Sequence, residues 1–152
     1  MGDFLIERAT EEILGEVAEL EELCFSFPWS KKSLKLLCSD KNVAFVAKDV
    51  NSGKVVAYGG MVTVLDEGQI TNIATHQSFR RRGLGLKIVS ALIDYARENE
   101  IVSISLEVRE SNLAAIELYK RLGFVEAGIR KKFYASPVED GIVMTLGVGE
   151  IS

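Results

Sequence analysis

The chain reads Arg80-Arg81-Arg82-Gly83-Leu84-Gly85 near its centre, a basic and glycine-rich turn. An extended apolar pattern, residues 70–75, comes just before it, and a long amphipathic pattern with helical spacing comes just after. Backbone N–H groups at the start of a helix attract negative charge, and glycine leaves them uncovered. The stretch therefore predicts a strand, an anion-binding turn and a helix.

Two familiar nucleotide motifs do not fit this turn. A dinucleotide fingerprint needs a third glycine where Ile88 stands. A P-loop needs Lys-Ser or Lys-Thr after its last glycine, where Leu86-Lys87 stands. A plain surface turn with solvated arginines remains the alternative.

Composition sets the broad class of the protein. The 152 residues are 47% hydrophobic and 26% charged, which is typical of one globular domain, here residues 1–152. The net charge of −4 gives no general attraction to nucleic acid, so we expect no direct nucleic-acid partner.

Several classes of site and location are not expected. No apolar run reaches the ~18 residues of a membrane span, and no basic, apolar leader is present. Cys24, Cys38 and the single His76 lack metal-ligand spacing. We therefore expect a cytoplasmic protein without a metal or a membrane partner.

Hydrophobic periodicity predicts seven strands and four helices. The strands are expected at 4–8, 43–48, 54–65, up to about 75, 101–109, about 124–132 and 141–148. Helices are expected after caps at Thr10 and Ser30, after the glycine turn, and from about Ser111 to Arg121; turns are expected at 51–53 and 66–68. The order β-α-α-β-β-β-α-β-α-β-β favours an α/β (α+β) fold with a mixed sheet and helices on both faces.

The strand predicted at 101–109 alternates clearly. Aliphatic side chains at 102, 104, 106 and 108 face one way, whereas Glu107 faces the other beside the small Ser103 and Ser105. A carboxylate half-sheltered in this way suits a general base. A simple ion pair of Glu107 with Arg109 or Arg130 is the alternative.

A second motif follows this strand. Leu106-Glu107-Val108-Arg109-Glu110-Ser111-Asn112 leads into Ala114-Ala115-Ile116-Glu117-Leu118-Tyr119-Lys120-Arg121-Leu122-Gly123-Phe124. Together with the glycine turn, this pattern resembles the GNAT superfamily of N-acetyltransferases. Phe27-Pro28-Trp29-Ser30, Asn72-Ile73-Ala74 and residues 130–134 resemble its RimI type, the ribosomal-protein-alanine N-acetyltransferases. The resemblance runs from about Phe4 to Leu146 and implies a mostly antiparallel, seven-stranded GNAT fold.

The resemblance implies acetyl-CoA as the cosubstrate. Its pyrophosphate would bind at the turn, and its pantetheine arm would run along the preceding strand, which splays from strand 101–109 in this fold. The residues implied are Ile73, Ala74, Thr75, Arg80, Arg81, Arg82, Gly83, Leu84, Gly85, Leu86 and Asn112. Asn112 also suits a helix N-cap.

The resemblance also implies two catalytic residues. Glu107 would take the proton of the attacking amine, and Tyr119 would give a proton to the departing thiolate. An aromatic residue on an apolar helix face is more often part of the core, which is the alternative for Tyr119.

Two loops are candidates for substrate binding. The aromatic segments 25–29 and 133–137, with the acidic Glu139 and Asp140, are expected to bound a groove for a peptide N-terminus. Trp29, Tyr134 and Glu139 are the candidate contacts to its cationic amine. The alternative is that the aromatic side chains of Phe25, Phe27 and Trp29 pack the first two helices onto the core. The expected reaction is acetylation of the N-terminal alanine of a small-subunit ribosomal protein. Another amine as substrate, or a non-catalytic acyl-CoA-binding regulator, remains open.

Overall fold

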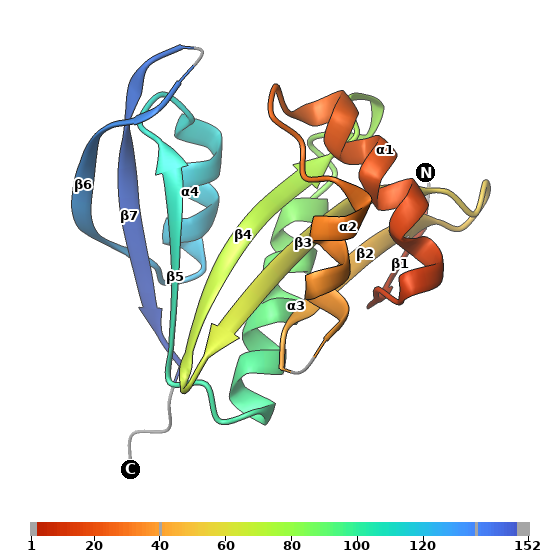
Figure 1. Ribbon diagram of the computed structural model, residues 1–152, viewed down its shortest axis with the longest axis horizontal. Helices are drawn as coiled ribbons and strands as arrows, with labels where there is room; N and C mark the ends of the chain where they lie inside the picture. Colours follow the sequence, from red (N-terminus) through yellow and green to blue (C-terminus); the bar gives the residue numbers. More distant parts are fainter. Residues whose placement is uncertain (1–2, 40, 136, 149–152) are drawn as a thin grey trace.

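The structure, a computed structural model, describes residues 3–39, 41–135 and 137–148. Seven strands of this part form one sheet in the order β1-β2-β3-β4-β5-β7-β6 (Figure 1). The strands are β1 (Phe4–Arg8), β2 (Val43–Asp49), β3 (Val55–Val64), β4 (Glu67–Thr75), β5 (Ser103–Arg109), β6 (Val125–Tyr134) and β7 (Glu139–Gly147). The α-helices are α1 (Leu14–Cys24), α2 (Lys31–Leu34), α3 (Leu84–Glu98) and α4 (Leu113–Arg121), with short 3-10 turns η1 (Glu11–Ile13), η2 (Lys35–Cys38) and η3 (Gln77–Phe79).

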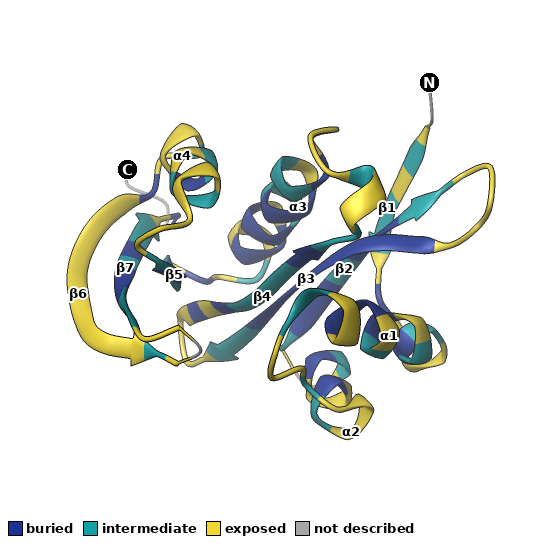
Figure 2. Ribbon diagram, turned by 90° about the horizontal axis from the view of Figure 1, so that it is seen from above, coloured by how far each residue is buried: buried dark blue, intermediate teal, exposed yellow. Residues whose placement is uncertain are grey.

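The sheet is mixed, as the sequence predicted. Every neighbouring pair of strands is antiparallel except β4 and β5, which run parallel. Helices α3 and α4 cover one face of the sheet, and α1 and α2 cover the other (Figure 2). The predicted fold class and element order are confirmed.

Each face has its own apolar core. Ile88 and Leu92 of α3 are buried with Ile104 and Leu106 of β5 in the larger cluster. Residues of α1, α2 and η2 build the second cluster over the other face, among them Leu14, Val17, Leu34 and Leu37. Burying one such aliphatic side chain contributes about 1.5–3 kcal/mol. Both helical layers are thereby fixed to the central strands.

The parallel pair β4–β5 is short, and this matters for the site. The two strands pair only from Glu67 to Gln69 with Ser103 to Ser105. From Ile70 onward the ladder of β4 continues only with β3, through an irregularity opposite Gly60. The strands diverge towards their carboxyl ends (Figure 1). The expected splay is therefore present, and one edge of β4 is free of β5.

Local chain features correct some predictions and confirm others. Thr10 directly precedes η1 and makes no side-chain capping bond, and α1 begins only at Leu14. Glu67 and Gly68 belong to β4, where they pair with both neighbouring strands, and the turn is made by Leu65 and Asp66. The predicted cap at Ser30 is confirmed, since its Oγ accepts a hydrogen bond of 3.1 Å from Ser33 N.

Candidate active site

The glycine turn ends in an uncapped helix N-terminus. Gly83 adopts a left-handed conformation with φ of 76° and has no side chain to cap α3. The first helical hydrogen bond runs from Lys87 N to Gly83 O at 3.1 Å. The N–H groups of Leu84, Gly85 and Leu86 come before this bond and have no intrahelical acceptor. We call residues 80–86 the anion cradle, because free amides and the helix dipole both favour negative charge.

The three arginines of the cradle are exposed and differ in their contacts. Arg80 Nε donates to the Thr75 carbonyl at 3.2 Å, which joins the cradle to the end of β4. The Arg82 guanidinium lies 5.2 Å from the centre of the Phe79 ring. Arg81 adopts a positive φ of 67°, which is uncommon for a residue with a Cβ. All three side chains belong to residues that directly precede the start of α3.

Gly85 has a packing role in addition to its place in the cradle. A Cβ at this position would lie 3.1 Å from Leu118 Cδ1 of α4. The absent side chain therefore lets α4 approach the first turn of α3.

The free edge of β4 presents alternate backbone groups. His76 N donates to Val56 O at 2.7 Å, so the backbone groups of His76 and, two residues earlier, Ala74 point to β3. Those of Ile73 and Thr75 then point away from β3, to the side where the strands diverge. The Thr75 carbonyl accepts from Arg80 and from Cys24 Sγ, so among the described residues both backbone groups of Ile73 and the N–H of Thr75 remain available there.

Glu107 lies on β5 with a sheltered side chain that is 13% exposed. Its Oε1 lies 3.3 Å from Arg130 Nε, and its Oε2 is buried with no hydrogen-bond partner among the described residues. The ion pair with Arg130 is present, but it engages one oxygen only. A buried, partnerless carboxylate oxygen is costly and is typical of a functional group.

Tyr119 lies on α4 and is 7% exposed. Its ring packs edge-on against Phe124 at 5.7 Å, and its hydroxyl makes no hydrogen bond with the described residues. Burial, with a smaller contribution from Tyr134, raises the pKa of Tyr119 to about 12. The ring belongs to the core, while the hydroxyl keeps its proton and can donate it.

Asn112 caps α4 through a hydrogen bond of 3.2 Å from Ala115 N to its Oδ1. The N-cap role is therefore present, and contact with a cosubstrate stays a prediction.

Glu139 is held by the protein on both oxygens. Its Oε2 lies 3.0 Å from Arg109 Nη1, and its Oε1 accepts from Ser111 N at 2.8 Å. Hydrogen bonding by Ser111 and then the Arg109 charge lower the pKa of this carboxyl. Arg109 also donates to the carbonyls of Ala135 and Pro137 at 2.9 Å each. Glu139 is thus tied into the β6–β7 hairpin, and a direct contact with substrate stays a prediction.

Tyr134 connects the hairpin to Glu107. The Arg109 guanidinium lies 4.6 Å from the centre of its ring, and Phe133 packs against it edge-on at 5.0 Å. Burial and then the negative charge of Glu107 raise the pKa of Tyr134. The candidate substrate residue Tyr134 therefore lies in the electrostatic field of the candidate base.

The aromatic side chains of the loop between α1 and α2 differ in burial. Phe25 and Trp29 are partly buried against the second core cluster, whereas Phe27 is 74% exposed. Core packing explains the first two side chains but not Phe27. This loop and the β6–β7 hairpin lie at the end of the sheet where β4 and β5 diverge (Figure 1).

Sequence reasoning missed the hairpin tether made by Arg109 and the buried partner of the Trp29 backbone. That partner is Glu21, whose Oε2 accepts from Trp29 N at 2.9 Å. Nothing in the sequence distinguishes Glu21 from the other glutamates of α1. For Arg109 a signal existed, because it shares a strand face with Glu107.

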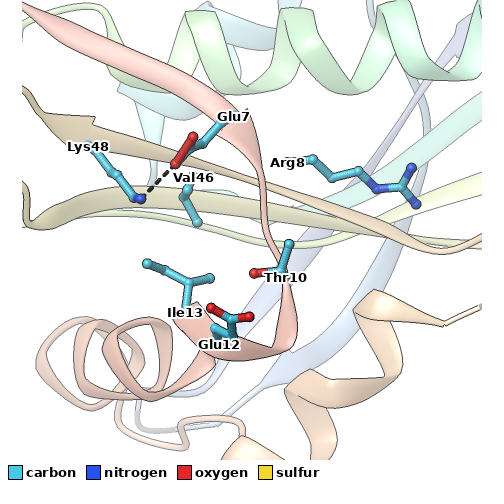
Figure 3. A pocket seen from close by; sticks show the side chains of 7 residues that line it. All are labelled: Glu7, Arg8, Thr10, Glu12, Ile13, Val46 and Lys48. Atoms are coloured by element: carbon cyan, nitrogen blue, oxygen red, sulfur yellow. Dashed lines mark ion pairs between the residues drawn. The ribbon is translucent and has the colours of Figure 1, made fainter.

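A pocket in the described structure lies elsewhere. It is formed by β1, β2 and η1 at the far edge of the sheet and is lined by Glu7, Arg8, Thr10, Glu12, Ile13, Val46 and Lys48 (Figure 3). Glu7 and Lys48 pair across it at 2.7 Å. It contains none of the candidate site residues.

Comparison with known proteins identifies the family. The model of the acetyltransferase (GNAT) family matches residues 14–124. The chain is 38% identical over 143 residues to the ribosomal protein bS18-alanine N-acetyltransferase of Salmonella typhimurium (strain LT2), covering 86% of the chain and 88% of the relative. The Escherichia coli (strain K12) protein of the same name is 37% identical over 131 residues, covering 85% and 87%. A crystal structure of the ribosomal-protein-alanine N-acetyltransferase from Escherichia coli superposes with a TM-score of 0.90 at 33% identity, over 99% of this chain and 97% of that one. The chain therefore belongs to the acetyltransferase (GNAT) family, as its motifs predicted.

Proposed function

We propose that this protein is an acetyl-CoA-dependent N-terminal acetyltransferase acting on the N-terminal alanine of a small-subunit ribosomal protein in the cytoplasm. The main observation for this chemistry is the Glu107 carboxylate, which is sheltered on β5 and has one buried oxygen without a partner among the described residues. The relatives, whose names specify the alanine of ribosomal protein bS18, support the substrate.

The described residues fit acetyl-CoA. The anion cradle offers unpaired amides and three exposed arginines to a pyrophosphate, and a Cβ at Gly83 would fill space that holds no atom within 4 Å. The free edge of β4 offers the backbone of Ile73 to a pantetheine arm. Bound there, acetyl-CoA supplies an activated acetyl group as a thioester.

Glu107 and Tyr119 then transfer the protons of the reaction. An ammonium has no lone pair, so Glu107 Oε2 takes one proton from the α-amine, directly or through water. The amine nitrogen forms the new bond to the acetyl carbon as the carbon–sulfur bond breaks, and the second proton that the nitrogen loses passes through water to restore the phenol of Tyr119. Tyr119 Oη, protonated because its pKa is about 12, gives a proton to the thiolate. Backbone amides at the irregularity in β4 are suited to stabilise the oxyanion.

The aromatic loop and the hairpin supply the surface for a peptide. The loop with the exposed Phe27 and with Trp29, and the hairpin with Tyr134, lie at the same end of the sheet. Glu139 fixes the hairpin through Ser111 and Arg109, which places Tyr134 near Glu107. A peptide N-terminus entering between these segments would reach the base.

Thiol release from acetyl-CoA by the purified protein tests this function. The acceptors are a peptide that begins with the N-terminal sequence of bS18, a polyamine, an aminoglycoside and an N-terminally blocked lysine peptide. We expect the highest kcat/KM with the first. Preferential turnover of another acceptor would replace the proposed substrate, and acetyl-CoA binding without any turnover would leave only the regulator.

A further inference from the structure

Glu21 is a fully buried carboxylate outside the proposed chemistry. It lies on α1 with 0% exposure and is the buried charged residue of the part of the chain that the structure describes. An unpaired buried charge is very costly, so its partners decide what it does. They come from three separate segments of the chain.

Two partners belong to the sheet. Tyr58 of β3 donates its hydroxyl to Oε1, and Asn72 of β4 donates Nδ2 to the same oxygen at 2.7 Å. Burial and the hydrogen bond to Glu21 raise the pKa of Tyr58, which keeps the phenol protonated as a donor. Asn72 directly precedes Ile73, the residue with free backbone groups on β4.

The third partner belongs to the aromatic loop. Trp29 N donates to Glu21 Oε2 at 2.9 Å, eight residues along the chain from the carboxylate. Hydrogen bonds to a charged acceptor are about twice as strong as neutral ones. One oxygen therefore fixes Glu21 to the sheet, and the other holds the loop.

We infer that Glu21 is a positioning residue that tethers the loop at residues 25–30 to β4 and thereby sets the affinity for the peptide substrate. The effect of Glu21 on peptide affinity rests on the proposed function, whereas the tether rests on the hydrogen bonds of its two oxygens. The carboxylate acts through Trp29 and does not touch the reacting atoms.

The substitution Glu21→Gln tests the tether at nearly constant shape. A carboxamide has one accepting oxygen, so it cannot serve the donors of the sheet and the Trp29 amide together. Since Trp29 is the single tryptophan of the chain, its fluorescence reports the loop without any need for turnover. We expect emission at longer wavelength and stronger quenching by acrylamide.

The kinetic constants should show that the change affects peptide binding selectively. We expect KM for the alanine peptide to rise about tenfold, in line with the loss of one charge-assisted hydrogen bond. KM for acetyl-CoA should stay within about twofold, and kcat should change less than the peptide KM.

Two controls separate positioning from stability. Glu22→Gln makes the same chemical change on an exposed neighbour and should alter neither the emission nor the peptide KM. Tyr58→Phe weakens the same buried network from the sheet side but leaves the bond to Trp29. It should lower the melting temperature without the shift in emission.

Unchanged emission and unchanged peptide KM in a folded Glu21→Gln variant would overturn the tether, as would equal changes in Tyr58→Phe. If the wild-type protein does not turn over the alanine peptide, the proposed function fails. The emission of the two variants still decides the tether in that case.

Discussion

Arg130 Nε lies 3.3 Å from Oε1 of Glu107, while the second oxygen of that carboxylate is buried without a partner among the described residues. The guanidinium fixes the orientation of the carboxylate, and the free oxygen remains available to accept a proton. The ion pair and the proposed base are therefore compatible in one side chain.

Glu107→Gln removes the proton acceptor and keeps the shape. We expect kcat/KM to fall by about a hundredfold or more, the usual contribution of a general base. The loss should be greatest at low pH, where the amine is charged and must lose a proton. A pH–rate profile measured with the alanine peptide checks this. Glu117→Gln, an exposed change on α4, should leave the profile unaltered; an identical profile for Glu107→Gln would remove Glu107 as the base.

Tyr119→Phe should lower kcat while acetyl-CoA affinity stays nearly constant, because only the hydroxyl is lost and the ring still packs on Phe124. With a pKa of about 12, the wild-type phenol stays protonated and able to donate across the neutral range. We therefore expect no fall in rate caused by Tyr119 below about pH 10. An alkaline fall below that pH that vanishes in Tyr119→Phe would contradict this assignment.

Gly83→Ala tests the anion cradle against a matched glycine. Gly83 and Gly53 have φ of 76° and 73°, and a Cβ at either would meet no atom within 4 Å. Each alanine should cost about 1 kcal/mol of unfolding free energy from the left-handed backbone. Calorimetric titration with CoA should show weaker binding for Gly83→Ala only. Equal affinities in both variants would argue against a cradle at residue 83.

Much of this fold could be predicted because its patterns are local. Apolar residues alternate along β5 and recur with helical spacing along α3 because each element buries one face. The long-range partners of charged residues could not be predicted. Glu139 looks like a free acid in the sequence, yet Arg109 and Ser111 hold it from 30 and 28 residues away. The helix start at Leu14 was also missed, since a 3-10 turn replaced the cap at Thr10.

Glu139→Gln tests the hairpin tether through the pH dependence of the melting temperature. Because the folded-state pKa of Glu139 is lowered, its contribution to stability is present above the ordinary pKa of about 4.3 and is lost as pH falls through the folded value. The wild-type melting temperature should therefore drop further on acidification from about pH 7 to about pH 3 than that of the variant. Glu126→Gln breaks an exposed pair with Lys120 and should keep the full acid dependence. Parallel acid dependence in wild type and Glu139→Gln would contradict the tether.

We propose transfer of acetyl to a peptide α-amine at the Glu107 site. It is tested most directly with two peptides of the same sequence, each beginning with alanine and containing one lysine, one with a free and one with a blocked N-terminus. We expect thiol release with the first alone, and fragment mass spectrometry should place the acetyl group on the alanine nitrogen. Equal rates with both peptides, or acetyl on the lysine, would contradict transfer to the α-amine.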